Sequence, residues 1–583
     1  MLISILAYFG IAYLPTRYFK VKFTYSLPAS LSLIMVFLYI CAMYKLLFLA
    51  TYLVYIVGMV SFCTYACFDR KELCYCLRQY LGEITILLCI ILIYAFYTRN
   101  AYFSSWDDFS FWGGASKELL LSNVFEKQDM FTSIIPLHAH YPRGPAVYHY
   151  FMLLFSGYSE AKALLAHFIF HLIFLAPLMA NKNYWHSIFI IMPILAIIML
   201  YTTGIRSIYN DSTIGLMFCS IIAIYILEIN KKRAIIISLP IFVLLPLFRE
   251  IGLILALIAA LIIIFKDIRE PKQPELKYNF ILYLLILCAP IMSNFIWASY
   301  FRDTHDFFGR TEHSFGNLLV LAKSFNGQSL LLVINYIKFL AIFLIKEGSL
   351  LIYVLIGLSW YAITKSKNEE YAVEYKFYFK SALIFGGVFS LWRLYLYFFA
   401  FSYSEAIKTA SLIRYLGCYC LIFAIIASVY FKKVLQHYNI KRKEFVVLLI
   451  VFIVSLLIVI IQTIRIQTNL SSAQLEFILR AKDVGFLIKQ GIKVQFNFSN
   501  KKEAFDCFNL NYAMSPYLNN YERGKCFAES ISYDPDNKLL LQDLQQKDTE
   551  YCINNKQSCR VEYFPFLNSI KFYFKDSSKL SNP

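Results

Sequence analysis

A succession of long apolar stretches, running from residue 2 to residue 464, constrains this 583-residue chain more than any other feature. A helix needs about 20 mostly apolar residues to cross a bilayer, where every backbone polar group must find its partner inside the protein. We therefore predict an all-α polytopic membrane bundle with about 12–15 spans. The candidate spans are 2–14, 25–44, 47–67, 83–98, 161–180, 186–203, 213–228, 234–247, 250–265, 278–300, 329–345, 348–363, 377–400, 412–431 and 446–464.

The composition excludes two other classes of protein. Hydrophobic residues make up 59% of the chain and charged residues 16%, whereas soluble domains have about 45–50% and about 25%. One large soluble enzyme and a disordered chain are both excluded. The net charge of +18 comes from basic residues that lie between the apolar stretches. This pattern indicates cytoplasmic loops of a membrane protein, so we expect no nucleic-acid partner.

The basic connections predict the orientation, because short cytoplasmic loops carry an excess of Lys and Arg. They are Arg17–Lys22, Asp69–Arg78, Lys231–Arg233, Lys266–Lys272, Lys365–Lys376 and Lys432–Lys443. Segments 99–160, 204–212, 248–252 and 401–411 then face outward, as does everything after about 466. If each candidate span between 300 and 364 crossed the membrane fully, the basic connection Lys365–Lys376 would lie on the outer side. One helix there is therefore expected to be re-entrant or interfacial.

The chain accordingly divides into four parts. We predict N-terminal spans (1–98), an extracytoplasmic loop with interfacial helices (99–160), a transmembrane core (161–465) and an extracytoplasmic C-terminal domain (466–583). The last part is polar, and the alternation over 492–498 predicts a strand in a small α/β domain. Its four cysteines predict two disulfides with the connectivity left open; they are Cys507, Cys526, Cys552 and Cys559.

The first outer loop carries an acidic pair directly after a span. Asp107 and Asp108 are adjacent, so their mutual repulsion is expected to raise the pKa of one of them. Lys117 follows in a segment typical of a surface helix. An acidic helix N-terminus, where Asp favours the helix dipole, is an equally good interpretation of the pair taken alone.

The same loop continues into a turn rich in Pro and Gly. His138, His140, Tyr141 and Arg143 lie in or just before this turn. Two histidines, one arginine and one aromatic ring would suit contact with an anionic sugar phosphate. The alternative is a rigid connector whose histidines are merely solvated.

Two further outer turns carry ionisable residues. Tyr209 and Asp211 lie at the mouth of a span, where Asp211 would also serve as a helix N-cap. Arg249 and Glu250 form the turn between two apolar helices. Ionisable groups between apolar helices are costly and usually functional, although a simple ion pair at a tight turn is the alternative.

Two late arginines complete the set. Arg414 enters a late span and offers several donors to phosphate oxygens. Arg393 lies deeper in the preceding span and is expected to contact substrate or to pair with a carboxylate. Because all these features fall on one predicted face, they suit group transfer from an anionic lipid donor. One carboxylate would deprotonate an acceptor hydroxyl, and the cations would stabilise the departing phosphate.

These motifs resemble those of the GT-C class of multi-spanning glycosyltransferases, which use polyprenyl-phosphate-linked sugars. The resemblance is to bacterial members related to dolichyl-phosphate-mannose mannosyltransferases and aminoarabinose transferases. An acidic pair in the first outer loop, a surface-helix lysine and a Tyr-Pro turn are similar to Asp107-Asp108, Lys117 and Tyr141-Pro142-Arg143-Gly144. The later matches are Gly157-Tyr158-Ser159-Glu160-Ala161, Tyr209-Asn210-Asp211, Arg249-Glu250-Ile251-Gly252 and Arg414-Tyr415.

The resemblance implies an inverting transfer to a glycan, lipid or protein acceptor on the outer face of the bacterial inner membrane. Asp107 would be the general base with Asp108 in support, and Asp211 would orient the acceptor. Arg249, Arg414 and Lys117 would hold the donor phosphate. A divalent cation, Mg²⁺ or Mn²⁺, is left open, with Asp107 and Asp211 as its oxygen ligands if it is used.

Two other kinds of polytopic protein are weighed against this interpretation. An O-antigen ligase or polymerase concentrates its chemistry in a large late outer loop, whereas the acids here come early. A transporter or flippase usually places its charges near mid-membrane in broken helices, often within paired repeats. No internal repeat is found, and the charges cluster at the mouths of spans.

Overall fold

The structure, a computed structural model, is mainly helical. It describes residues 1–68, 70–71, 78, 81–103, 105, 107–125, 141–179, 184–201, 207–269, 280–304, 327–399, 401, 403–435, 442–468, 494–498, 559–564 and 569–574. The helices up to residue 201 are α1 (Leu2–Phe19), α2 (Phe23–Met43), α3 (Leu47–Phe68), α5 (Leu81–Thr98), the π-helix η1 (Asp108–Trp112), α6 (Gly113–Ser122), α7 (Gly144–Leu153), α8 (Glu160–Leu175), the 3-10 helix η3 (Ala176–Met179) and α9 (Tyr184–Tyr201). The later ones are α10 (Asp211–Leu227), α11 (Lys231–Phe248), α12 (Ile251–Arg269), α13 (Phe280–Thr304), α15 (Gly327–Leu344), α16 (Glu347–Ser366), α17 (Glu369–Phe399), α18 (Tyr403–Ile407), α19 (Leu412–Leu435) and α20 (Arg442–Thr468).

Each predicted span coincides with one of these helices. Within the described part of the chain, 11 helices are long and apolar enough to cross a membrane, fewer than the 12–15 spans expected. The other expected spans fall on α5, α9, α10 and α11. The first three have shorter apolar stretches, at Leu87–Thr98, Ser187–Tyr201 and Asp211–Leu227, and α11 begins with three basic residues.

The helices alternate in direction, so the bundle has two chemically different ends. We call the end where α5, α11 and α17 finish and α10, α12 and α19 begin the site end. At the opposite end, Glu374 of α17 accepts hydrogen bonds from Lys433 Nζ (3.1 Å) and Tyr430 Oη (3.0 Å) of α19. Lys266 Nζ of α12 lies 3.6 Å from the same carboxylate. This buried network ties three helices together far from the site end.

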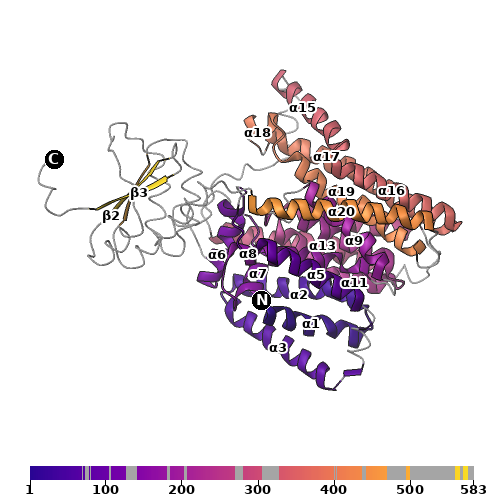
Figure 1. Cartoon of the computed structure of the whole chain (residues 1–583), viewed down its shortest axis with the longest axis horizontal. Coiled ribbons are helices and arrows are strands. Elements are labelled where there is room, and N and C mark those ends of the chain that lie inside the picture. The colour runs from indigo at the N-terminus through magenta and orange to yellow at the C-terminus, as the bar shows by residue number, and fades with distance from the viewer. Residues whose placement is uncertain are drawn as a thin grey trace, which may run out of the picture.

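The first three helices pack as a group along one side of the bundle (Figure 1). Gly10 of α1 and Gly58 of α3 face each other so closely that a Cβ on either would clash with the other helix's backbone. Small residues allow helix backbones to approach in this way inside a membrane. Tyr55 of α3 then donates a hydrogen bond to the Phe151 carbonyl of α7. The N-terminal group therefore supports α7, whose ten residues are all buried.

Helix α15 is placed differently from its neighbours. Its Asn335 Nδ2 donates to the Ile407 carbonyl of α18 (3.1 Å), and its Tyr336 Oη donates to the Ser390 carbonyl of α17 (2.7 Å). The middle of α15 thus packs on the last part of α17, and α15 extends beyond it (Figure 1). Whether α15 is the interfacial helix expected between 300 and 364 stays a prediction.

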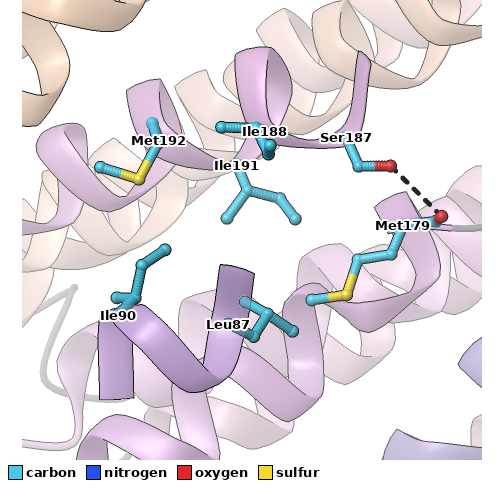
Figure 2. A pocket seen from close by; sticks show the side chains of 7 residues that line it. All are labelled: Leu87, Ile90, Met179, Ser187, Ile188, Ile191 and Met192. Atoms are coloured by element: carbon cyan, nitrogen blue, oxygen red, sulfur yellow. Dashed lines mark hydrogen bonds between the residues drawn. The ribbon is translucent and has the colours of Figure 1, made fainter. Parts of the chain in front are cut away.

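A small apolar pocket lies between α5, η3 and α9 (Figure 2). Leu87, Ile90, Met179, Ile188 and Met192 line it, together with Ile191 and Ser187, whose hydroxyl donates to the Met179 carbonyl (3.3 Å). The pocket lies near the start of α5 and α9, away from the site end. Its lining offers no charged group, so it plays no part in the site described below.

The described residues of the C-terminal part form a three-stranded sheet. It consists of β1 (Val494–Phe498), β2 (Cys559–Phe564) and β3 (Ser569–Phe574) in the order β1-β2-β3. β1 pairs parallel with β2, with Val494 opposite Cys559, and β2 pairs antiparallel with β3, with Cys559 opposite Phe574. β1 covers residues 494–498 of the strand predicted over 492–498. The small α/β domain as a whole stays a prediction, and Cys507, Cys526 and Cys552 lie outside the described residues, so their disulfides do too.

Candidate functional site

The acidic pair lies where the chain turns from α5 into the first loop. Asp107 immediately precedes η1, and its side chain is 26% exposed. Asp108 is the first residue of η1 and is fully buried. A π-helical turn is rare and often marks a functional site. The two carboxylates are therefore chemically different despite being adjacent in sequence.

Asp108 fastens the first loop to the second. Its Oδ1 accepts a hydrogen bond from the backbone N–H of Ile208 (3.0 Å). Burial raises the pKa of the Asp108 carboxyl well above its ordinary value; the bond from Ile208 opposes this shift, and the nearby charges of Asp107 and Glu160 add to it. Burial thus favours the neutral form of Asp108, and the raised pKa expected for one member of the pair is confirmed in direction.

Tyr209 makes the second link between these loops. The backbone N–H of Asp107 donates to Tyr209 Oη (3.0 Å). The Arg414 guanidinium lies over the Tyr209 ring, 4.4 Å from its centroid. Tyr209 consequently sets the position of both Asp107 and the arginine that contacts it.

Asp211 binds two arginines from different helices. Its Oδ1 accepts a hydrogen bond from Arg249 Nη1 (2.5 Å), and its Oδ2 forms an ion pair with Arg414 Nε (2.8 Å). Asp211 is fully buried and is the first residue of α10, while Asn210 occupies the N-cap position. The N-cap interpretation of Asp211 is therefore wrong, because both of its oxygens face guanidinium groups.

Arg414 joins Asp211 to Asp107. Its Nη1 donates to Asp107 Oδ2 (3.2 Å), and Arg249 Nη2 donates to Tyr415 Oη (2.8 Å). The result is one continuous chain of contacts from Tyr415 through Arg249, Asp211 and Arg414 to Asp107. Acids and cations therefore alternate along this chain of contacts.

The Tyr415 ring is the meeting point of three arginines. The guanidinium carbon of Arg393 lies 3.7 Å from the ring centroid, that of Arg249 5.1 Å and that of Arg414 5.3 Å. Arg393 is only 3% exposed and also lies near the rings of Tyr397 and Phe401. The described contacts of Arg393 are thus with aromatic rings, and the carboxylate partner suggested as an alternative is not among them.

Aromatic rings of the first loop cover the other side of Arg249. Its guanidinium carbon lies 5.7 Å from the Trp112 ring centroid and 6.0 Å from that of Tyr141. These two rings stack on each other with 6.0 Å between centroids. Burial raises the pKa of Tyr141 to about 12, although the nearby Arg249 charge opposes the shift. Tyr141 is therefore a neutral wall of the site at physiological pH.

Arg143 lies apart from this cluster. Its Nη1 is 3.5 Å from Glu118 Oε2 of α6, and its backbone N–H donates to Tyr39 Oη (3.2 Å). The next residue, Gly144, begins α7 so close to the Leu247 carbonyl that a side chain there would clash. The Tyr-Pro-Arg-Gly turn thus docks α7 on α11, and the structure does not bring Arg143 to Asp107.

The remaining predicted site residues are Lys117, Glu250, His138 and His140. Lys117 lies in α6, next to Glu118, and is half-buried. Glu250 is exposed in the turn between α11 and α12. His138 and His140 lie outside the described residues, so their role stays a prediction.

Several residues that were not predicted as site residues support the site. Glu160 accepts a hydrogen bond from the Phe103 backbone (2.5 Å), just before the acidic pair. His167 Nε2 lies 3.2 Å from the Tyr209 carbonyl and 3.2 Å from Thr213 Oγ1, and His171 Nε2 lies 2.9 Å from Ser212 Oγ. Two histidines one helical turn apart on α8 therefore brace the segment around Asp211. Their i, i+4 spacing was the signal available, but on an apolar helix such a pattern usually indicates core packing.

The arrangement does not fit a divalent cation at Asp107 and Asp211. Both oxygens of Asp211 face guanidinium groups, and Arg414 contacts Asp107 as well. A cation bound by these oxygens would replace, and be repelled by, those positive charges. Across the described ranges, no group of three or more His, Cys, Asp or Glu residues is arranged to hold a metal ion.

Comparison with known proteins adds one structural likeness. No protein-family model matches the sequence, and no curated protein matches it significantly. Among solved structures, the chain is similar to the crystal structure of ArnT from Cupriavidus metallidurans in the apo state. The two share 12% sequence identity, and the alignment covers 83% of this chain and 93% of that chain with a TM-score of 0.37. At this level of similarity, the functional argument rests on the contacts described above.

Proposed function

We propose that the chain is an integral membrane glycosyltransferase that moves a sugar from a polyprenyl-phosphate donor to an envelope glycan, lipid or protein. The observation that carries the proposal is the contact chain at the site end, which joins the first, second and third loops to α19. Within that chain Asp107 is the partly exposed carboxylate, whereas Asp211 and Asp108 are fully buried. A partly exposed acid next to a cluster of arginines suits proton transfer beside an anionic group.

The proposed reaction is a single displacement with inversion. Asp107 accepts the proton of the acceptor hydroxyl, and the acceptor oxygen forms a bond to the anomeric carbon. The bond from that carbon to the phosphate oxygen breaks, and the phosphate leaves with the bonding electrons. Arg414 contacts Asp107 at Oδ2, which fixes the orientation of the carboxylate and directs Oδ1 toward the acceptor. Asp211 holds Arg414 and Arg249 in place and acts as a positioning residue.

The charge distribution supports a site that faces outward. The opposite end carries buried and half-buried lysines such as Lys266, Lys432 and Lys433. Lys231 and Arg233 lie at the same end, at the start of α11. Because basic residues collect on the cytoplasmic side, this distribution supports our proposal that the site end faces the periplasm of a bacterial inner membrane.

Comparison of envelope glycans tests the function directly. In the source bacterium, the gene is deleted and the strain is complemented with the wild-type chain or with Asp107→Asn. Mass spectrometry is expected to show one sugar residue missing from an envelope glycan, lipid or glycoprotein, restored only by the wild type. An altered glycan chain length with every sugar present would point to a ligase or polymerase instead. Unchanged envelope glycans in the deletion strain would contradict the proposal.

A further inference from the structure

Arg393 differs from the other arginines of the site in having no counter-ion among its described contacts. It is 3% exposed, and its Nε and Nη2 atoms are buried without a hydrogen-bond partner in the part of the chain that the structure describes. A buried charged group without a hydrogen-bond partner is unfavourable, because the loss of its hydration is not compensated. Stacking on Tyr415 offsets part of this cost, but it provides no acceptor for Nε and Nη2.

The charge balance of the surrounding cluster also leaves Arg393 without a carboxylate partner among the described residues. Three guanidinium groups, from Arg249, Arg393 and Arg414, gather around the Tyr415 ring. The two carboxylates in the contact chain, Asp107 and Asp211, are taken up by Arg249 and Arg414. Arg393 therefore supplies the positive charge that these carboxylates do not balance, together with donors suited to two oxygens of one anion.

The geometry of an inverting transfer also separates the base from the phosphate. The anomeric carbon lies between them, so a cation that binds the phosphate should not contact the base directly. Arg414 is unsuitable for this role, because its Nη1 is 3.2 Å from Asp107 Oδ2. Arg393 reaches the cluster from the other helix, α17, and contacts the Tyr415 ring instead of the acids.

We propose that Arg393 receives the donor's phosphate group and that Arg249 and Arg414 chiefly hold the acids in position. This inference rests on the proposed function. It differs from the role expected from the sequence, in which Arg249 and Arg414 hold the phosphate. The shared chemistry is an anionic phosphate group, which either a lipid-linked donor or free phosphate would provide. Tyr415 is the surface on which the guanidinium is oriented toward that anion.

Binding measurements on the full-length protein in lipid nanodiscs test the inference. Native mass spectrometry would compare undecaprenyl phosphate, undecaprenol and inorganic phosphate as probes. We expect the wild type to prefer undecaprenyl phosphate over undecaprenol, and Arg393→Gln to weaken that binding by about tenfold or more. Arg233→Gln removes a charge that pairs with Glu228 at the opposite end (2.6 Å) and is expected to leave binding unchanged.

A conservative variant keeps the test decisive if Arg393→Gln does not fold. Arg393→Lys retains the charge but cannot donate through a planar fork, so it is expected to bind undecaprenyl phosphate several-fold more weakly than the wild type. Wild-type affinity in both variants, or in Arg393→Lys alone if only it folds, would overturn the role of Arg393. Binding of inorganic phosphate as tight as that of undecaprenyl phosphate would identify free phosphate as the ligand and overturn the lipid-linked source. A wild type that does not distinguish undecaprenyl phosphate from undecaprenol would instead contradict the proposed function itself.

Discussion

Arg414 and Asp107 are 307 positions apart in sequence, yet the Arg414 guanidinium donates to the Asp107 carboxylate at 3.2 Å. This contact joins the first loop to a late helix and orients the one partly exposed acid of the cluster. The same guanidinium also contacts Asp211, so both acidic loops depend on a single side chain. Substitutions of different residues in this chain of contacts should therefore have different consequences.

Removal of the Asp211 charge should destabilise the protein as well as inactivate it. In Asp211→Asn, the buried Arg249 and the partly buried Arg414 lose their shared counter-ion, and breaking a buried pair in this way costs about 3–5 kcal/mol. We expect a lower thermal unfolding midpoint for the purified protein in detergent, followed by intrinsic fluorescence. Glu369→Gln, at an exposed carboxylate in the first turn of α17, is the control. An unfolding midpoint like that of the control would show that Asp211 does not hold the two arginines.

Asp108 should be replaceable by its neutral isostere. Because the folded state raises its pKa, the neutral acid is the form that the fold favours, and its stabilising effect is lost as pH rises through the raised pKa. The wild-type unfolding midpoint should therefore fall as pH rises. In Asp108→Asn the side chain still accepts the hydrogen bond from the Ile208 N–H but does not titrate, so the midpoint should depend less on pH. We also expect this variant to keep most of its transfer activity. Activity lost as completely as in Asp107→Asn would mean that Asp108 acts as a carboxylate.

His167 should affect turnover through the segment that it braces. Replacement by Phe removes its contacts with the Tyr209 carbonyl and Thr213, and a small displacement of reacting groups lowers rates by about 10–100-fold. We expect kcat to fall with little change in donor KM, and His167→Gln, which keeps a polar nitrogen near the same place, to recover part of the loss.

Tyr148→Phe provides the matched control for His167. It removes a different buried hydrogen bond of the same helix, from Tyr148 Oη to the Ala166 carbonyl (2.7 Å), which involves neither Tyr209 nor Thr213. If this variant lowers kcat as much as His167→Phe does, the effect of His167 reflects general packing and not positioning of the Tyr209–Thr213 segment.

The helices were predictable from the sequence because bilayer thickness imposes a minimum apolar length. The stretch predicted at 412–431, for example, corresponds to α19 (Leu412–Leu435). The count of spans was less predictable, because helices such as α10 have 17 residues and are buried on all sides. For such a helix, the sequence does not distinguish a short span from a core helix.

The site was predictable as a set of residues but not as a pattern of contacts. Asp107, Asp211, Arg249 and Arg414 were expected on one face because each follows or precedes an apolar stretch, and the structure brings them together. Their alternation was not foreseeable, since pairing depends on side-chain geometry between distant helices. The contact between Arg143 and Glu118 was not foreseeable for the same reason, because Glu118 lies on α6, which packs beside α7.

The central claim is that Asp107 is the base of a sugar transfer, and a rate measurement on Asp107→Asn tests it most directly. The protein is reconstituted with a polyprenyl-phosphate sugar and its acceptor, once glycan comparison has identified them, and single-turnover transfer is followed. We expect the rate to fall by about 10²–10⁴-fold while undecaprenyl phosphate binding and the unfolding midpoint stay near those of Glu347→Gln, an exposed carboxylate of α16. A transfer rate equal to that of the wild type would contradict the assignment of Asp107 as the base.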